Sequence, residues 1–131
     1  MANYLLDSDV IIDALNGKRG RATLIERLLL DGHSLACCAI SITEVYAGLR
    51  SEERAQTREF LLGLNFHAIT WEIARRAGLL KRHWSRKGIT LAVTDVTIAA
   101  VALERDLSLI TGNRKHYPMP ELQLYPLPEE A

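Results

Sequence analysis

Acidic residues stand at the ends of short apolar runs in this sequence, where a fold can bring them together. They are Asp7, Asp9, Glu44 and Asp95. Carboxylates that converge repel one another, and some become protonated unless a cation lies among them. Their hard oxygen atoms are ligands that suit Mg²⁺ or Mn²⁺. The residue types therefore indicate a divalent-metal site, provided that the surrounding elements place these side chains at one edge of the molecule.

Each acid also fits a purely structural role. Asp7 or Asp9 can cap the first helix of the chain. Ser41 and Glu44 have the spacing of a capping box, and Asp95 suits the positive first turn of a helix. Taken singly, these structural roles are the commoner explanation. Taken together, several acids beside one buried helix favour a metal site, and a carboxylate with two oxygens can serve both purposes.

The hydrophobic pattern predicts strands that alternate with helices. The expected strands are 4–6, 35–40, 66–69 and 107–110, with an edge strand at 122–125 as a fifth candidate. The expected helices are 10–15, 22–30, 41–49, 52–62, 70–87 and 94–105. Such alternation implies right-handed crossovers and a parallel sheet covered on both faces. We therefore predict an α/β fold with a central parallel sheet of four or five strands, flanked by helices on both faces.

The predicted helix 94–105 is apolar on nearly every side, which places it inside the molecule. In an open parallel sheet, ligands gather beyond the carboxyl ends of the strands. The acids either follow the first two predicted strands or open this buried helix, while Thr111 and Asn113 follow the last strand. Segments that are distant in the sequence are thus expected to place oxygen-bearing side chains at one edge.

The composition fits one compact domain over residues 1–131, with about 126–131 as a flexible tail. Lysine plus arginine equal aspartate plus glutamate at 16 each, which argues against a protein that coats nucleic acid by bulk charge. The adjacent Cys37 and Cys38 are expected to be reduced core thiols. Because no stretch looks like a membrane span or a signal peptide, we expect a soluble, cytoplasmic protein.

Four segments resemble the motifs of PIN-domain nucleases in order and spacing. They are 5–12 (LLDSDVII), 41–49 (SITEVYAGL), 95–102 (DVTIAAVA) and 109–117 (LITGNRKHY). The second segment carries its acid on a helix, the third has the pattern D-x-x-I-A-A-x-A, and the fourth has T-x-N followed by an aromatic residue. The chain length is similar to that of the VapC-like toxins, which consist of a PIN domain alone.

The resemblance implies a Mg²⁺- or Mn²⁺-dependent endoribonuclease, the toxin of a type II toxin–antitoxin pair. The residues that it implies as metal ligands and catalytic groups are Asp7, Glu44 and Asp95. Thr111 would orient Asp7 by a hydrogen bond, Asn113 would complete the rim, and Asp9 is a supporting residue. The resemblance further implies an RNA substrate, a homodimer and a cognate VapB-like antitoxin that blocks the site.

One position departs from the family pattern. Many relatives carry an aspartate at or shortly after the position of Asn113, where this chain has no acid. We therefore expect one firmly bound metal ion and a second ion that is poorly held.

Basic residues are expected to hold the RNA. Arg114 and Lys115 are the better candidates, because they lie near the acids in the predicted arrangement. The segment 81–87 is the densest basic stretch and contains an aromatic residue, so Arg82 and Arg86 would grip phosphates while the ring stacks on a base. A solvated helix face is the simpler explanation of that stretch.

Two other functions fit part of the pattern. Asp7-x-Asp9 matches the motif of haloacid-dehalogenase-type phosphatases, in which Asp7 would be the nucleophile. That enzyme would also need a lysine and a later acidic pair, and Glu44 would have no role in it. The second alternative is a PIN-like binding module without activity, in which the oxygen-rich edge is structural and the apolar helices contact a partner.

Overall fold

The computed structural model describes residues 1–127. Its sheet has four strands in the order β3-β2-β1-β4, and every neighbouring pair is parallel. The strands are β1 (Asn3–Leu6), β2 (Ser34–Cys38), β3 (Asn65–His67) and β4 (Ser108–Ile110). The α/β class and the parallel sheet predicted from the sequence are confirmed.

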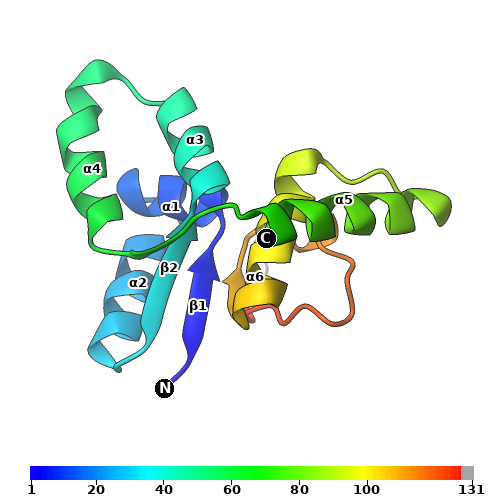
Figure 1. Ribbon diagram of the computed structural model, residues 1–131. Helices are drawn as coiled ribbons and strands as arrows, with labels where there is room; N and C mark the ends of the chain where they lie inside the picture. The colour runs from blue at the N-terminus through cyan, green and yellow to red at the C-terminus, as the bar shows by residue number, and fades with distance from the viewer. Residues whose placement is uncertain (128–131) are drawn as a thin grey trace.

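Helices connect the strands and cover both faces of the sheet. They are α1 (Ser8–Leu15), α2 (Arg21–Leu30), α3 (Ala39–Ala47), α4 (Arg54–Leu62), α5 (Trp71–Arg86) and α6 (Val93–Arg105), with 3₁₀ turns η1 (Ser51–Glu53) and η2 (Arg114–His116). Residues of α1, α2 and α4 form the core on one face, and residues of α5 and α6 form the core on the other. In Figure 1, α2 and α6 accordingly lie on opposite sides of β1.

Alternate residues of the central strands supply the two cores. Leu5 and Leu109 pack with α5 and α6, whereas their neighbours Leu6 and Ile110 pack with α1 and α2. Successive strand residues point to opposite faces, so a strand covered on both sides is apolar throughout. This explains why β1 and β4 each end in two adjacent apolar residues, Leu5-Leu6 and Leu109-Ile110.

Helix α6 is buried over most of its length, as its sequence predicts. Ile98, Ala99, Ala100 and Val101 have no exposed surface. Small alanine side chains let a helix approach its neighbours closely, and α6 packs against α5 and α3. Asp95, in the first turn of α6, is thereby held at a fixed place beside the end of the sheet.

Some boundaries differ from the sequence prediction. Strand β2 ends at Cys38 and does not reach residue 40, because Ala39 already begins α3. Within residues 1–127 the expected fifth strand is reduced to an isolated parallel bridge between Leu109 and Leu124. Leu127 is buried against the core, while the remainder of the predicted tail, 128–131, lies outside the described residues.

Both cysteines are buried free thiols, as the sequence predicts. Burial raises the pKa of Cys37 to about 11 and also raises the pKa of Cys38. No helix in the described part of the chain is long and apolar enough to cross a membrane.

Candidate active site

Asp7 is the centre of a hydrogen-bonded cluster at the carboxyl edge of the sheet. It follows β1 directly and caps α1, with Oδ1 accepting a 2.8 Å hydrogen bond from the Ser8 backbone N–H. Its Oδ2 accepts hydrogen bonds from the Thr111 hydroxyl at 2.8 Å and the Tyr117 hydroxyl at 2.9 Å. Asp7 is only 4% exposed. The hydrogen bond expected between Thr111 and Asp7 is therefore present.

Asp95 reaches the same cluster from the first turn of α6. Its Oδ1 lies 3.5 Å from the Tyr117 hydroxyl, and its Oδ2 lies 3.3 Å from His116 Nδ1. Burial is the main cause that raises the pKa of Asp95, and the charge of Asp7 raises it further, while His116 and Tyr117 oppose the shift. Burial and then the charges of Asp7 and Asp95 raise the pKa of Tyr117, which keeps its phenol protonated as a donor.

Glu44 is linked to Asp7 through a serine. The Ser8 hydroxyl donates a 2.9 Å hydrogen bond to Glu44 Oε1 and lies 3.5 Å from Asp7 Oδ1. The capping-box interpretation of Ser41 and Glu44 is wrong, because α3 begins at Ala39 and places Glu44 beyond the first turn. Glu44 is thus free to face the end of β1.

Asp9 ties α1 to the loop that follows β4. Its Oδ2 accepts a 2.8 Å hydrogen bond from the Gly112 backbone N–H. A Cβ at position 112 would lie 2.6 Å from that oxygen, so any other residue there would force the Asp9 side chain to move. Burial, and then the charge of Asp7, raises the pKa of Asp9 to about 6. Its Oδ1 is buried and accepts no hydrogen bond from the described residues.

The acids do not form a closed metal cage as they lie. Within residues 1–127, no three His, Cys, Asp or Glu side chains are grouped closely enough to hold a metal ion. Instead the hydroxyl groups of Ser8 and Tyr117 lie between the carboxylates.

The donor set nevertheless fits a divalent metal. Asp7, Glu44 and Asp95 come from different elements and are separated by one bridging hydroxyl each. Carboxylate oxygens are the ligands that Mg²⁺ and Mn²⁺ prefer. The effect of Asp7 on the pKa of Asp95 shows that these charges repel, and a bound cation would relieve that repulsion.

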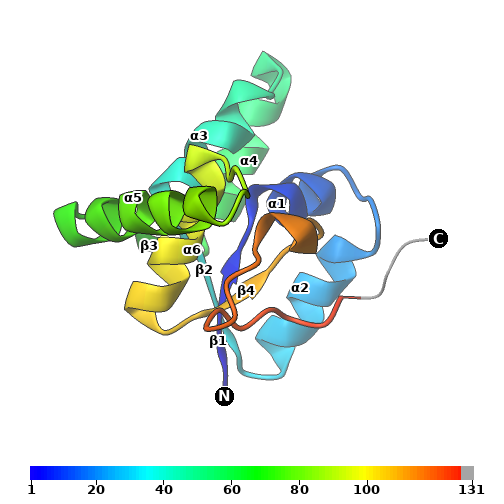
Figure 2. The same ribbon diagram turned by 90° about the vertical axis from the view of Figure 1, so that its right-hand side faces the viewer.

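A cleft of about 920 Å³ is bordered by the α1–α2 connection and the segment after β4. Its acidic lining residues are Asp9 and Asp13, whereas Asp7, Glu44 and Asp95 do not line it. Its basic lining residues are Arg19, Arg21, Arg114, Lys115 and His116. Arg19 forms a 3.1 Å ion pair with Asp13, and the Arg114 guanidinium lies 3.4 Å from the Tyr125 carbonyl oxygen. In Figure 2 the segment after β4, drawn in orange, lies beside α1. His116 of this segment lines the cleft and contacts Asp95, so it connects the cleft to the cluster of acids.

The other residues named from the sequence fall in different places. Asn113 lines the cleft, and its backbone N–H donates a 3.0 Å hydrogen bond to the Thr111 hydroxyl. Arg114 and Lys115 also line the cleft. Arg82 and Arg86 are exposed on α5 and do not line it.

Sequence reasoning missed the roles of Ser8 and Tyr117. Both lie inside motif segments, but Ser8 was a spacer between acids and Tyr117 only an aromatic residue. The available signal was the hydroxyl itself, since a buried tyrosine needs a hydrogen-bond partner for its O–H group. Nothing in the linear sequence names the acids as that partner.

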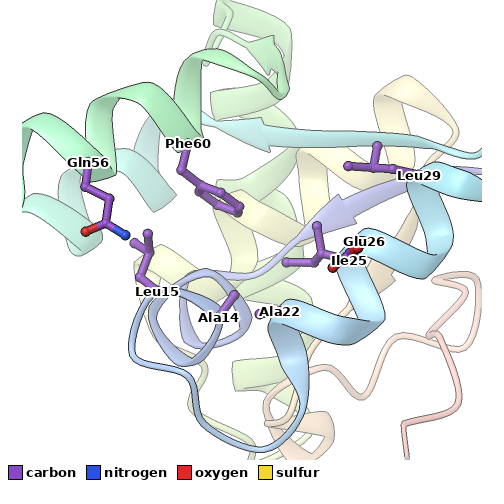
Figure 3. A pocket seen from close by; sticks show the side chains of 8 residues that line it. All are labelled: Ala14, Leu15, Ala22, Ile25, Glu26, Leu29, Gln56 and Phe60. Atoms are coloured by element: carbon purple, nitrogen blue, oxygen red, sulfur yellow. The ribbon is translucent and has the colours of Figure 1, made fainter.

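A separate apolar groove lies between α1, α2 and α4 (Figure 3). Its volume is about 320 Å³, and its lining residues are Ala14, Leu15, Ala22, Ile25, Glu26, Leu29, Gln56 and Phe60. Leu29 is 49% exposed at its edge, and the neighbouring Leu30 is 79% exposed but does not line it. A groove with this apolar lining can receive the apolar side chains of a partner segment.

The chain is similar to known proteins over nearly its whole length. The family model described as PIN domain matches residues 4–122. Ribonuclease VapC10 of Mycobacterium tuberculosis is 37% identical over 122 residues, covering 93% of this chain and 90% of the relative. Ribonuclease VapC19 of the same organism is 32% identical over 120 residues, covering 91% of this chain and 96% of the relative.

A solved structure shows the same fold. A toxin-antitoxin complex from Klebsiella pneumoniae contains a chain that aligns with a TM-score of 0.81 and 26% identity, covering 97% of this chain and 99% of that chain. Sequence and fold agree: the chain belongs to the PIN domain family and, within it, to the VapC ribonucleases.

Proposed function

We propose that this protein is a Mg²⁺- or Mn²⁺-dependent endoribonuclease toxin that acts in the cytoplasm and is neutralised by a cognate antitoxin. The observation that carries the proposal is the linked set Asp7, Glu44 and Asp95, which α1, α3 and α6 bring to one edge of the sheet. The haloacid-dehalogenase alternative is wrong, because the chain belongs to the PIN domain family.

The three carboxylates would hold the metal, which when bound activates water and polarises the scissile phosphate. Asp7 is fixed by donors on both oxygens and is the most rigid ligand. Glu44 would bind the metal or accept a proton from the attacking water. In-line attack on phosphorus would leave a 5′-phosphate and a 3′-hydroxyl, and no nucleophilic side chain is needed.

The cleft with its basic lining is the proposed path of the RNA. Arg114 and Lys115 line the cleft and share η2 with His116, which contacts Asp95, so the phosphates that flank the scissile bond would meet positive charge there. A chain with zero net charge would then bind RNA through a local surface, not through its overall field.

The antitoxin is proposed to cover the apolar groove between α1, α2 and α4. The similar Klebsiella protein was solved in a toxin-antitoxin complex. The groove presents aliphatic and aromatic side chains with Glu26 and Gln56 among them, which suits an amphipathic segment that carries apolar anchors. We also infer a homodimer, as family membership implies.

The decisive experiment is to incubate the purified protein with total RNA, with and without EDTA. Cleavage that needs Mg²⁺ or Mn²⁺ is expected, and Asp7→Asn and Asp95→Asn should each reduce it by roughly 100-fold or more, because each change removes a charged ligand. Asp31→Asn, at an exposed carboxyl at the end of α2, is the matched control and should retain activity.

Full cleavage by Asp7→Asn in the presence of Mg²⁺ would show that the site is misassigned. A wild-type protein that folds and binds its antitoxin but cuts no RNA would instead support the inactive binding module.

A further inference from the structure

Tyr117 is buried between two of the proposed metal ligands. It follows η2 and is only 3% exposed. Its hydroxyl donates a 2.9 Å hydrogen bond to Asp7 Oδ2 and lies 3.5 Å from Asp95 Oδ1. A phenol has one proton to donate. The short distance places that proton on the Asp7 bond, and the longer one marks a weaker contact with Asp95.

This hydrogen bond determines which oxygen of Asp7 remains available. Oδ2 accepts from both the Tyr117 and the Thr111 hydroxyl, so its two lone-pair positions are occupied. Oδ1 accepts one short hydrogen bond, from the Ser8 backbone N–H. Oδ1 is therefore the atom of Asp7 that has capacity for another ligand. The carboxylate plane cannot rotate without breaking the hydrogen bonds from Ser8, Thr111 and Tyr117.

The ring of Tyr117 has a separate role from its hydroxyl. The ring belongs to the core cluster formed with α5 and α6, which a phenylalanine ring would also fill. The hydroxyl adds nothing to that packing, and its contacts are with Asp7 and Asp95. The motif resemblance at this position calls only for an aromatic residue and does not explain the hydroxyl.

We propose that Tyr117 is a positioning residue that fixes the orientation of Asp7 beside Asp95, so that the site binds a divalent metal more tightly than the carboxylates alone would. The inference rests on the proposed metal site. Hydrogen bonds from neighbouring groups commonly set the geometry and basicity of metal ligands, and their loss typically weakens metal binding by about 10- to 100-fold.

The test is a Mn²⁺ titration of wild-type protein and Tyr117→Phe by calorimetry, with thermal unfolding in EDTA to confirm the fold. Tyr117→Phe is expected to weaken Mn²⁺ binding by about tenfold. The Mn²⁺ concentration for half-maximal RNA cleavage should rise by the same factor, while the rate at saturating Mn²⁺ changes little. Tyr125→Phe is the control, because its ring packs on Tyr4, away from the acids.

The outcomes separate this inference from the proposed function. If the wild-type protein binds no Mn²⁺, the metal site itself is refuted and the inference with it. If wild-type protein and Tyr117→Phe bind Mn²⁺ equally, Tyr117 is only a core residue, and the proposed function stands.

A second measurement uses the wild-type protein, in case Tyr117→Phe does not fold. Tyrosine labelled with ¹³C at Cζ gives one signal for each of the 4 tyrosines, assigned by phenylalanine substitution at the other positions. Saturating Mg²⁺ should shift the Tyr117 signal more than the other three. A Tyr117 signal that Mg²⁺ leaves in place would overturn the inference.

Discussion

At the scale of single residues, the acids of this site serve structure and chemistry together. Asp7 caps α1 and accepts hydrogen bonds from Thr111 and Tyr117, although it is also the central proposed ligand. A carboxylate has enough lone pairs for both roles. The structural explanation of each acid and the functional one were therefore never exclusive, and finding a cap at Asp7 does not argue against a metal site.

One methyl group at Gly112 should disturb this arrangement. Gly112→Ala places a Cβ 2.6 Å from Asp9 Oδ2, so Asp9 must turn away and lose its hydrogen bond from the Gly112 N–H. A hydrogen bond to a charged group contributes about 1.5–3 kcal/mol. Alanine also lowers the conformational entropy of the unfolded chain, which stabilises the fold by about 0.4–1 kcal/mol and offsets part of this loss. We expect a net loss of about 1 kcal/mol, measured by urea unfolding in EDTA.

Gly78→Ala is the matched control, and we expect it to change the free energy of unfolding in the opposite direction. Gly78 lies on an exposed face of α5, where an added Cβ meets no atom within 4 Å. Alanine is the better helix former by about 1 kcal/mol, so this variant should gain stability. In an Asp9→Ala background the clash is gone, and Gly112→Ala should no longer destabilise. If Gly112→Ala still lowers the free energy of unfolding in the Asp9→Ala background, the contact with Asp9 is not the cause of its destabilisation.

At the scale of elements, the site is made where connections leave the carboxyl edge of the sheet. The N-cap of α1, the body of α3 and the first turn of α6 contribute Asp7, Glu44 and Asp95, and the segment after β4 contributes Thr111 and Tyr117. The 3₁₀ turn η2 brings Arg114 and Lys115 to the cleft, whereas α5 carries its basic stretch elsewhere. This placement supports the sequence-based preference for Arg114 and Lys115 as RNA contacts over the basic stretch of α5.

Charge reversal on η2 should weaken RNA binding. Arg114→Glu with Lys115→Glu would remove two positive charges that line the cleft, where we expect the RNA phosphates to bind. In EDTA, the slope of log affinity against log salt should become shallower by about 0.7 for each phosphate that the protein no longer neutralises. Fluorescence anisotropy with a labelled single-stranded RNA measures this directly.

Arg82→Glu with Arg86→Glu is the control, because it makes the same change in charge on α5, outside the cleft. Both residues are exposed and lie outside the cleft, so a smaller effect on affinity and salt slope is expected. A larger effect from the α5 pair would reassign the RNA surface to that helix.

At the scale of the whole molecule, the acidic edge and the apolar groove are separate surfaces. The groove between α1, α2 and α4 shares no lining residue with the basic cleft. Substitutions in the groove can therefore affect a protein partner without altering the proposed catalytic groups.

Leu29→Lys should separate inhibition from catalysis. Leu29 lines the groove and is 49% exposed, so lysine there costs little stability but removes an apolar contact. We expect ribonuclease activity near that of wild type and inhibition by the antitoxin weakened by at least about tenfold, as for an interface anchor. The probe is a purified VapB-like antitoxin, chosen because it inhibits the wild-type protein.

Leu30→Lys is the control on the same helix. Leu30 is 79% exposed and does not line the groove, so inhibition should be unchanged. Equal inhibition of Leu29→Lys and wild-type protein would show that the antitoxin binds elsewhere.

The sequence alone determined the α/β class, the parallel sheet and the buried α6. Apolar periodicity and strand direction are local properties, and parallel strands bring their following residues to one edge whatever the side-chain details. Asp7, Glu44, Asp95 and Thr111 could be named as neighbours on that basis, helped by a family resemblance.

Only the tertiary structure decided how those neighbours touch. Ser8 pairs with Glu44 across 36 positions, and Tyr117 pairs with Asp7 across 110. Such contacts depend on packing angles and rotamers that no local pattern encodes. The start of α3 at Ala39 was likewise hidden, because its N-cap, Cys38, makes no side-chain capping bond that a sequence signal could reveal.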